Sequence, residues 1–135
     1  MNVYEMHTGK LNDMAIRILL ADDQPLVRQG LRMYLALDKE LEIVGEAGNG
    51  YEAVQMASHL VPDIILMDLM MPQMNGVEAT EQLRFNGIQA GIIALSQSQD
   101  SHLIDAAMKA GADIFISKEI HNDDLITVIK RIVSA

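Results

Sequence analysis

Residues 63–76 read D-I-I-L-M-D-L-M-M-P-Q-M-N-G, an apolar run that ends in a single aspartate, Asp68, and is followed by turn residues. A short apolar run bounded by turn signals is typical of a strand that is buried on both faces, as in a parallel sheet. We therefore predict a strand at Asp63–Met67 with Asp68 at its carboxyl end. Taken alone, a carboxylate after so apolar a strand fits a helix cap or a turn, and other residues must decide whether it has a chemical role.

The rest of the chain alternates between similar apolar runs and amphipathic segments. The apolar runs predict further strands at Ile16–Ala21, Leu41–Glu46, Gly91–Leu95 and Ala112–Ser117. Helical spacing of apolar residues predicts helices at about 25–37, 51–60, 76–85, 100–110 and 122–133. Five strands and five helices in alternation predict an α/β fold with a parallel sheet, which right-handed crossovers cover with helices on both faces.

Composition bounds the class of protein. A chain of 135 residues suits one domain, and the polar residues 1–15 are interpreted as an N-terminal extension. The absence of cysteine excludes disulfides and thiolate metal sites. A net charge of −9 disfavours direct binding to nucleic acid. A chain without cysteine is compatible with a cytoplasmic location, which is the default expectation. The longest apolar runs are too short to cross a bilayer, so no membrane contact is expected.

Polar side chains follow four of the five predicted strands. Asp22 and Asp23 follow the first strand, Asp68 ends the third, Ser96 the fourth and Lys118 the fifth. In an open parallel sheet, these carboxyl ends form the ligand-binding edge. Clustered carboxylates repel one another unless a cation lies between them, and oxygen ligands at an open edge suit Mg²⁺. A carboxylate is also a nucleophile toward phosphorus, while lysine and serine can stabilise phosphoryl oxygens.

This combination of residues resembles the receiver domains of two-component response regulators. The stretches A-D-D-Q-P-L-V-R-Q-G-L, E-I-V-G-E-A-G-N-G-Y-E-A and P-D-I-I-L-M-D-L-M-M-P-Q-M-N-G are similar to the NarL/FixJ-type, LuxR-like subfamily in particular. The resemblance covers residues 16–135. It implies a doubly wound, flavodoxin-like (βα)5 fold with five parallel strands in the order 2-1-3-4-5.

The resemblance also implies a role for each acidic residue. Asp68 would accept a phosphoryl group from a sensor histidine kinase. Mg²⁺ would be bound directly by Asp23, largely through water by Asp22, and also by Asp68 and the backbone carbonyl of Met70. The domain would then be a phospho-switch that catalyses its own phosphorylation and dephosphorylation, and not an enzyme that acts on a separate substrate.

The remaining implied roles concern switching. Ser96 would be the switch hydroxyl, Phe115 the aromatic switch and Lys118 the counter-charge for the phosphoryl group. Met70 and Ser98 occupy the two variable positions that tune dephosphorylation. An apolar Met70 cannot orient a water by hydrogen bonding, so we expect a long-lived phosphoryl state.

The output is expected to lie outside this domain. In the subfamily that the chain resembles, a C-terminal helix-turn-helix domain binds DNA, and such a domain is expected to be absent from this chain. Phosphorylation is expected to promote a homodimer, through the first and last helices or through the face of the fourth helix, fifth strand and fifth helix. A stand-alone receiver that acts by protein–protein contact is the alternative.

Two other classes fit part of the sequence. Gly48-Asn49-Gly50 begins a G-x-G-x-x-A motif that follows a strand and opens a helix, as in dinucleotide-binding domains. That interpretation leaves Asp22, Ser96 and Lys118 unexplained, and these glycines are better interpreted as a turn that needs positive φ. A dehalogenase-type phosphatase needs D-x-D at Asp68, but the third position is Met70. Asp23 is also predicted to cap the first helix.

Overall fold

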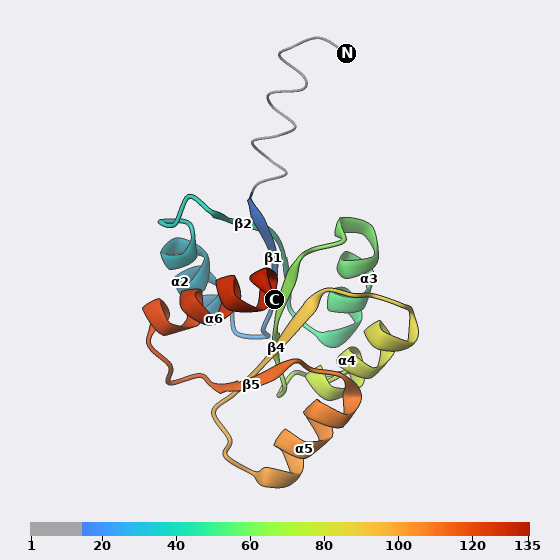
Figure 1. Ribbon diagram of the computed structural model, residues 1–135. Helices are drawn as coiled ribbons and strands as arrows, with labels where there is room; N and C mark the ends of the chain where they lie inside the picture. Colours follow the sequence, from blue (N-terminus) through green and yellow to red (C-terminus); the bar gives the residue numbers. More distant parts are fainter. Residues whose placement is uncertain (1–14) are drawn as a thin grey trace, which may run out of the picture.

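The computed structural model describes residues 15–135, and Figure 1 shows a central sheet with helices on both sides. The strands are β1 (Ile16–Ala21), β2 (Leu41–Ala47), β3 (Ile64–Asp68), β4 (Gly91–Ser96) and β5 (Ile114–Ser117). The helices are α2 (Pro25–Leu35), α3 (Gly50–Leu60), α4 (Gly76–Phe85), α5 (Ser101–Ala110) and α6 (Asn122–Ser134). The predicted N-terminal extension lies, except for its last residue, outside the described residues.

The sheet is parallel throughout and its strand order is β2-β1-β3-β4-β5, which confirms the predicted doubly wound, flavodoxin-like fold. The chain winds outward from β1 in both directions, so the strand order reverses beside β1 and β3. Ligands of doubly wound folds bind in the crevice at that reversal, outside the carboxyl ends of the strands. The topology therefore places the ends of β1 and β3 at the centre of the binding edge.

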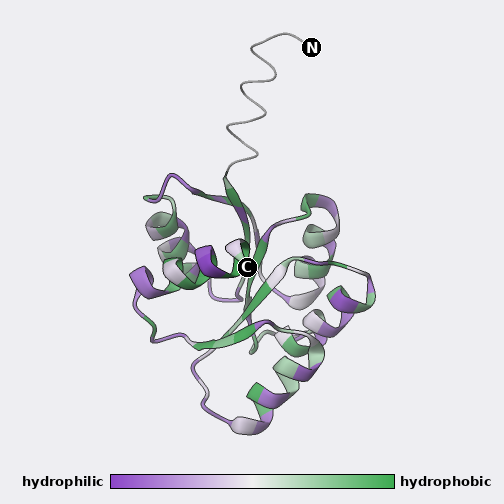
Figure 2. Ribbon diagram, viewed as in Figure 1, coloured by the Kyte–Doolittle hydropathy of each residue, from purple (hydrophilic) through white to green (hydrophobic). Residues whose placement is uncertain are grey.

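Two separate apolar cores lie on the two faces of the sheet. One core contains side chains of α3, α4 and α5, such as Ala57, Leu83 and Ala107, packed on the sheet face of Ile65. The other contains side chains of α2 and α6, such as Leu35. Strands covered on both sides must be apolar on both faces, which is why β3 has no polar residue before Asp68. In Figure 2 the strands are largely hydrophobic and the helices carry hydrophilic residues as well.

Local sequence signals fix several helix ends. Pro25 lies in the first turn of α2, where a missing N–H costs nothing. Asn75 and Glu78 form a reciprocal capping box at the start of α4. The prediction that Asp23 caps α2 was wrong. The cap position is Gln24, which makes no side-chain cap bond, and its amide donates to Asp22 Oδ1 at 2.9 Å.

The glycine turn before α3 is built differently from the prediction. The positive-φ residues of the described chain do not include Gly48 or Gly50. Gly50 is required by close approach instead, since a Cβ there would lie 2.3 Å from the carbonyl oxygen of Met74. The Gly50 amide donates to that same oxygen at 2.9 Å. This contact ties the start of α3 to the loop that follows Asp68.

Among residues 15–135, no helix is long and apolar enough to cross a membrane.

Candidate functional site

The strand register brings the predicted site residues to one edge of the sheet. Ala21 pairs with Met67, Asp68 with Leu95, and Ser96 with Ser117, so the carboxyl ends of four strands are nearly level. Residues that follow these strands line an open cavity of about 320 Å³: Asp23, Gln24, Asp68, Met70, Ser96, Gln97, Ser98 and Lys118. This cavity at the carboxyl edge is the candidate functional site.

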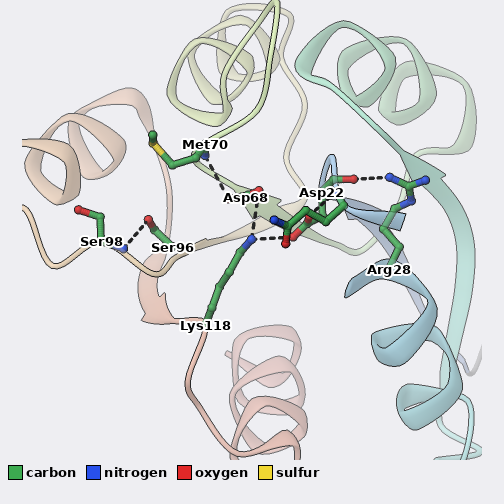
Figure 3. A network of polar contacts seen from close by, with 8 residues as sticks. Asp22, Arg28, Asp68, Met70, Ser96, Ser98 and Lys118 are labelled. Carbon is green, nitrogen blue, oxygen red and sulfur yellow. Dashed lines mark hydrogen bonds and ion pairs between the residues drawn. The ribbon is translucent and has the colours of Figure 1, made fainter. Parts of the chain in front are cut away.

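Three carboxylates and one ammonium group form its polar centre, and Figure 3 shows Lys118 reaching Asp22 and Asp68. Asp22, Asp23 and Asp68 each present an oxygen within 4.8 Å of the others. Asp22 and Asp68 are buried, while Asp23 is exposed. The Lys118 Nζ atom lies 2.8 Å from Asp22 Oδ2 and 3.1 Å from Asp68 Oδ2. Lys118 offsets one of three negative charges, which leaves a formal charge of −2 that a divalent cation would balance.

Both oxygens of Asp68 have partners. Oδ1 accepts a hydrogen bond from the Met70 amide at 3.1 Å, and Oδ2 faces Lys118. Desolvation by burial raises the pKa of Asp68, although the Met70 amide and the charge of Lys118 act in the opposite direction. Burial lowers the pKa of Lys118, but its hydrogen bonds and charge interactions with Asp22 and Asp68 outweigh burial, so the net shift is upward. Lys118 therefore stays protonated at neutral pH.

Three of the four side chains predicted to switch or tune the site lie around this centre. Ser96 is buried, and its Oγ accepts the Ser98 amide at 3.1 Å. Met70 is 62% exposed and lines the same cavity. Phe115 does not line the cavity: its ring is partly buried on β5 and packs against the core of α3, α4 and α5.

The donor set fits Mg²⁺ by its chemistry. Its members are carboxylate oxygens, which Mg²⁺ prefers, and the open cavity leaves room for the several waters that this ion retains. Within residues 15–135, no thiolate or imidazole joins the three aspartates, so softer metals have no matching ligand there. Asp22, Asp23 and Asp68 are the residues that could hold the cation.

Comparison with known sequences decides the family. The sequence profile of the response regulator receiver domain matches residues 18–130. The chain belongs to the response regulator receiver domain family. This receiver domain is 36% identical over 120 residues to the nitrate/nitrite response regulator NarL of Escherichia coli K12, which covers 89% of this chain and 56% of NarL. It is 37% identical over 119 residues to the transcriptional regulatory protein LnrK of Bacillus subtilis, covering 88% of this chain and 54% of LnrK.

Solved structures agree with the sequence comparison. The signal receiver domain of a response regulator named NarL from Mycobacterium tuberculosis superimposes with a TM-score of 0.86 at 25% identity, covering 90% of this chain and 98% of that one. A LuxR-family two-component response regulator from Aurantimonas gives 0.83 at 32% identity, covering 89% and 86%. The chain spans a little over half the length of the curated relatives that it matches. The NarL and LuxR-type resemblance is thus confirmed for the receiver domain.

The receiver's glycine motif is not arranged as a dinucleotide site. The Gly48 amide donates to Glu52 Oε1 at 2.7 Å, and the Gly50 amide to the Met74 carbonyl. A pyrophosphate needs free amides at a helix N-terminus. Here two of these amides are bonded within the chain, and the Glu52 carboxylate would repel the anion. The geometry therefore disfavours the dinucleotide alternative.

Some residues of the receiver's site escaped the sequence analysis. Gln24 and Gln97 line the cavity, each one position after a predicted site residue. Arg28 donates through Nη1 to the backbone carbonyl of Asp22 at 2.5 Å. Arg28 and Arg32 are four residues apart on α2, and both face Glu46 near the end of β2. That i, i+4 pair of arginines was the signal that could have indicated a contact between α2 and the strand edge.

Proposed function

We propose that this receiver domain is a Mg²⁺-dependent phospho-switch in which Asp68 accepts a phosphoryl group from a histidine kinase. The carrying observation is the position of Asp68: it is buried at the base of an open cavity, with two further carboxylates and an ammonium group within reach. Receiver domains are signalling switches and not enzymes that turn over a separate substrate. In the proposed reaction, the protein itself is therefore the acceptor of the phosphoryl group.

The transfer would proceed by attack of an Asp68 carboxylate oxygen on the phosphorus of a phosphohistidine. The new P–O bond forms as the P–N bond breaks, and the electron pair leaves with the imidazole nitrogen. The ammonium group of Lys118 already lies 3.1 Å from Asp68, so it can form an ion pair with an oxygen of the transferred phosphoryl group. Ser96 Oγ, on the neighbouring strand, can donate to another phosphoryl oxygen.

Asp22, Asp23, Asp68 and the backbone carbonyl of Met70 would hold the metal ion. A bound Mg²⁺ supplies charge neutralisation for the incoming phosphoryl group and alignment with the attacking oxygen. Asp23 is exposed and suits direct ligation, whereas Asp22 is already engaged by Lys118 and Gln24 and suits contact through water. The net charge of the cluster supports a divalent cation.

Phosphorylation would bias an equilibrium between two conformations of the domain. Ser96 would move toward the phosphoryl group and Phe115 would turn inward, altering the surface of α5, β5 and α6. That surface, or the surface of α2 and α6, would then form a homodimer. The relatives named above support control of transcription as the output, through a DNA-binding domain beyond this chain. Action by protein–protein contact alone remains the second candidate.

Two positions at the mouth of the cavity would set how long the signal lasts. Met70 is exposed and apolar, so it cannot orient an attacking water. The Ser98 amide is bonded to Ser96, which links this tuning position to the switch hydroxyl. We expect a long-lived phosphoryl state.

The deciding experiment is phosphorylation by acetyl phosphate and Mg²⁺, followed by intact mass measurement, on the wild type and on Asp68→Asn. We expect one added phosphoryl group in the wild type alone, and none when Mg²⁺ is replaced by EDTA. An unchanged wild-type mass under conditions that label another receiver domain would refute the phospho-switch. Size-exclusion chromatography of the labelled protein then tests the dimer, which a monomeric elution volume would contradict.

A further inference from the structure

Arg28 lies on the face of α2 that points toward the ends of β1 and β2 (Figure 3). Its Nη1 atom donates to the backbone carbonyl of Asp22 at 2.5 Å, and its Nε lies 3.4 Å from Glu46 Oε1. Nε is buried and makes no hydrogen bond with any residue of the described chain. The guanidinium is therefore held between a main-chain carbonyl of the acidic site and a carboxylate of β2.

This contact completes the bonding of Asp22. Its amide donates to the Ala47 carbonyl at 3.0 Å, its Oδ1 accepts the Gln24 amide, and its Oδ2 faces Lys118. Arg28 supplies the partner of the one remaining polar group, the carbonyl. The three other contacts come from β2, from Gln24 at the N-cap of α2 and from Lys118, so Arg28 is the only one of these partners that lies within α2 itself.

We propose that Arg28 is a positioning residue for the cation site: by holding the Asp22 carbonyl, it fixes the direction in which Asp22 and Asp23 present their carboxylates. The inference rests on the proposed function, since it assumes that these carboxylates bind Mg²⁺. Mg²⁺ requires near-ideal octahedral geometry, so a small rotation of the Asp22–Asp23 backbone costs affinity. Mutation of a residue that orients a metal ligand through a hydrogen bond typically lowers metal affinity by about 10- to 100-fold.

Electrostatics alone predicts the opposite change in Mg²⁺ affinity when Arg28 is removed. Arg28 is a cation beside an acidic cluster, and removing a cation strengthens the attraction of that cluster for Mg²⁺. A purely electrostatic role therefore predicts tighter binding in Arg28→Ala. A positioning role predicts weaker binding. The direction of the change separates the two roles without any assumption about magnitude.

The neighbouring Arg32 provides a matched control. Its Nη1 atom forms an ion pair with the same Glu46 at 2.7 Å, but its only hydrogen bond recorded in the described chain goes to that carboxylate and not to Asp22. Arg32→Ala removes one positive charge from the same helix and weakens the same ion-pair cluster. It leaves the Asp22 carbonyl contact in place.

The test is calorimetric titration of metal-free protein with Mg²⁺, for the wild type, Arg28→Ala, Arg28→Lys and Arg32→Ala. We expect Arg28→Ala to weaken binding about 10-fold, and Arg32→Ala to leave it unchanged or slightly tighter. Arg28→Lys keeps the charge but has a single nitrogen, which cannot serve both the carbonyl and Glu46, so we expect an intermediate affinity. Hydrogen exchange of the Gln24 amide in the metal-free protein should be faster in Arg28→Ala alone.

Equal or tighter Mg²⁺ binding by Arg28→Ala, or exchange at Gln24 equal to that of Arg32→Ala, would overturn the inference and leave the proposed function intact. Absence of Mg²⁺ binding by the wild type would overturn both. If Arg28→Ala does not fold, the Arg28→Lys variant decides. Wild-type affinity for Mg²⁺ in Arg28→Lys would contradict the inference, because lysine cannot contact both the Asp22 carbonyl and Glu46.

Discussion

Gly76, the first residue of α4, allows the helix to approach the backbone of Asp68. A Cβ at this position would lie 2.2 Å from the Asp68 carbonyl oxygen and 2.8 Å from the Leu69 Cα. Real Cβ atoms essentially never come within 3.0 Å of such atoms, so Gly76→Ala must separate α4 from Asp68 by about 0.8 Å or more. Both obstructing atoms belong to the backbone and cannot rotate away.

A displacement of this size at the proposed phosphoacceptor has a calculable effect. A misplacement of about 1 Å costs roughly 100-fold in rate when a reaction depends on alignment. Overpacking should also lower the free energy of unfolding by about 1–3 kcal/mol. We therefore expect Gly76→Ala to remain folded at low temperature and to accept a phosphoryl group about 100 times more slowly than the wild type.

The assay is the rate of mass gain with acetyl phosphate and saturating Mg²⁺, measured well below the unfolding temperature. Gly30→Ala is the matched control, because a Cβ at Gly30 meets nothing within 4 Å. Gly30 lies in the interior of α2, so this change should stabilise the protein by about 0.5–1 kcal/mol and leave the rate unchanged. A wild-type rate in folded Gly76→Ala would refute the argument that α4 fixes the position of Asp68.

Three further predictions concern charge and packing. Burial raises the pKa of Asp68 in the folded protein above its ordinary value of 3.8. The contribution of this group to folding stability is therefore fully present below pH 3.8 and is lost as the pH rises through the pKa of the folded state. Asp68→Asn should therefore unfold at a higher temperature than the wild type at pH 7 in EDTA, with the gap closing on acidification; a lower melting temperature at pH 7 would contradict this. Lys118→Ala removes the ammonium that faces Asp22 and Asp68 and should slow labelling about 100-fold, which the same mass assay measures. Leu83 is fully buried, so Leu83→Ala should lower the free energy of unfolding in urea by about 2–5 kcal/mol, and a loss below 1 kcal/mol would show that the core relaxes around it.

The fold was predictable because its signals are local. Each strand was visible as an apolar run, and the alternation with helices fixed the parallel topology; the predicted boundaries differ from the structure by no more than a few residues. The cluster of Asp22, Asp23, Asp68 and Lys118 was also predictable, because strand ends meet at one edge whatever the details of packing. The order of strands and helices along the chain was enough to predict that these four residues lie together.

What escaped prediction depends on contacts between distant segments. Gly50 was assigned a positive φ from its motif, but its actual constraint is the carbonyl of Met74, 24 residues away. Asp23 was predicted to cap the first helix, yet the cap position is Gln24, whose amide donates to the carboxylate of Asp22. The contact of Arg28 with Glu46 exists only because α2 packs beside β2. Local conformational propensities of the residues cannot reveal such contacts between separate segments.

The separation of the two cores has a consequence for divergence and engineering. Since the sheet separates the side chains packed under α2 and α6 from those packed under α3, α4 and α5, a volume change on one face is not transmitted directly to the other. Substitutions on opposite faces should combine nearly additively. A lineage, or a designer, can therefore remodel the outer surface of one helical layer for a new partner, repack the core beneath it, and leave the opposite layer unchanged.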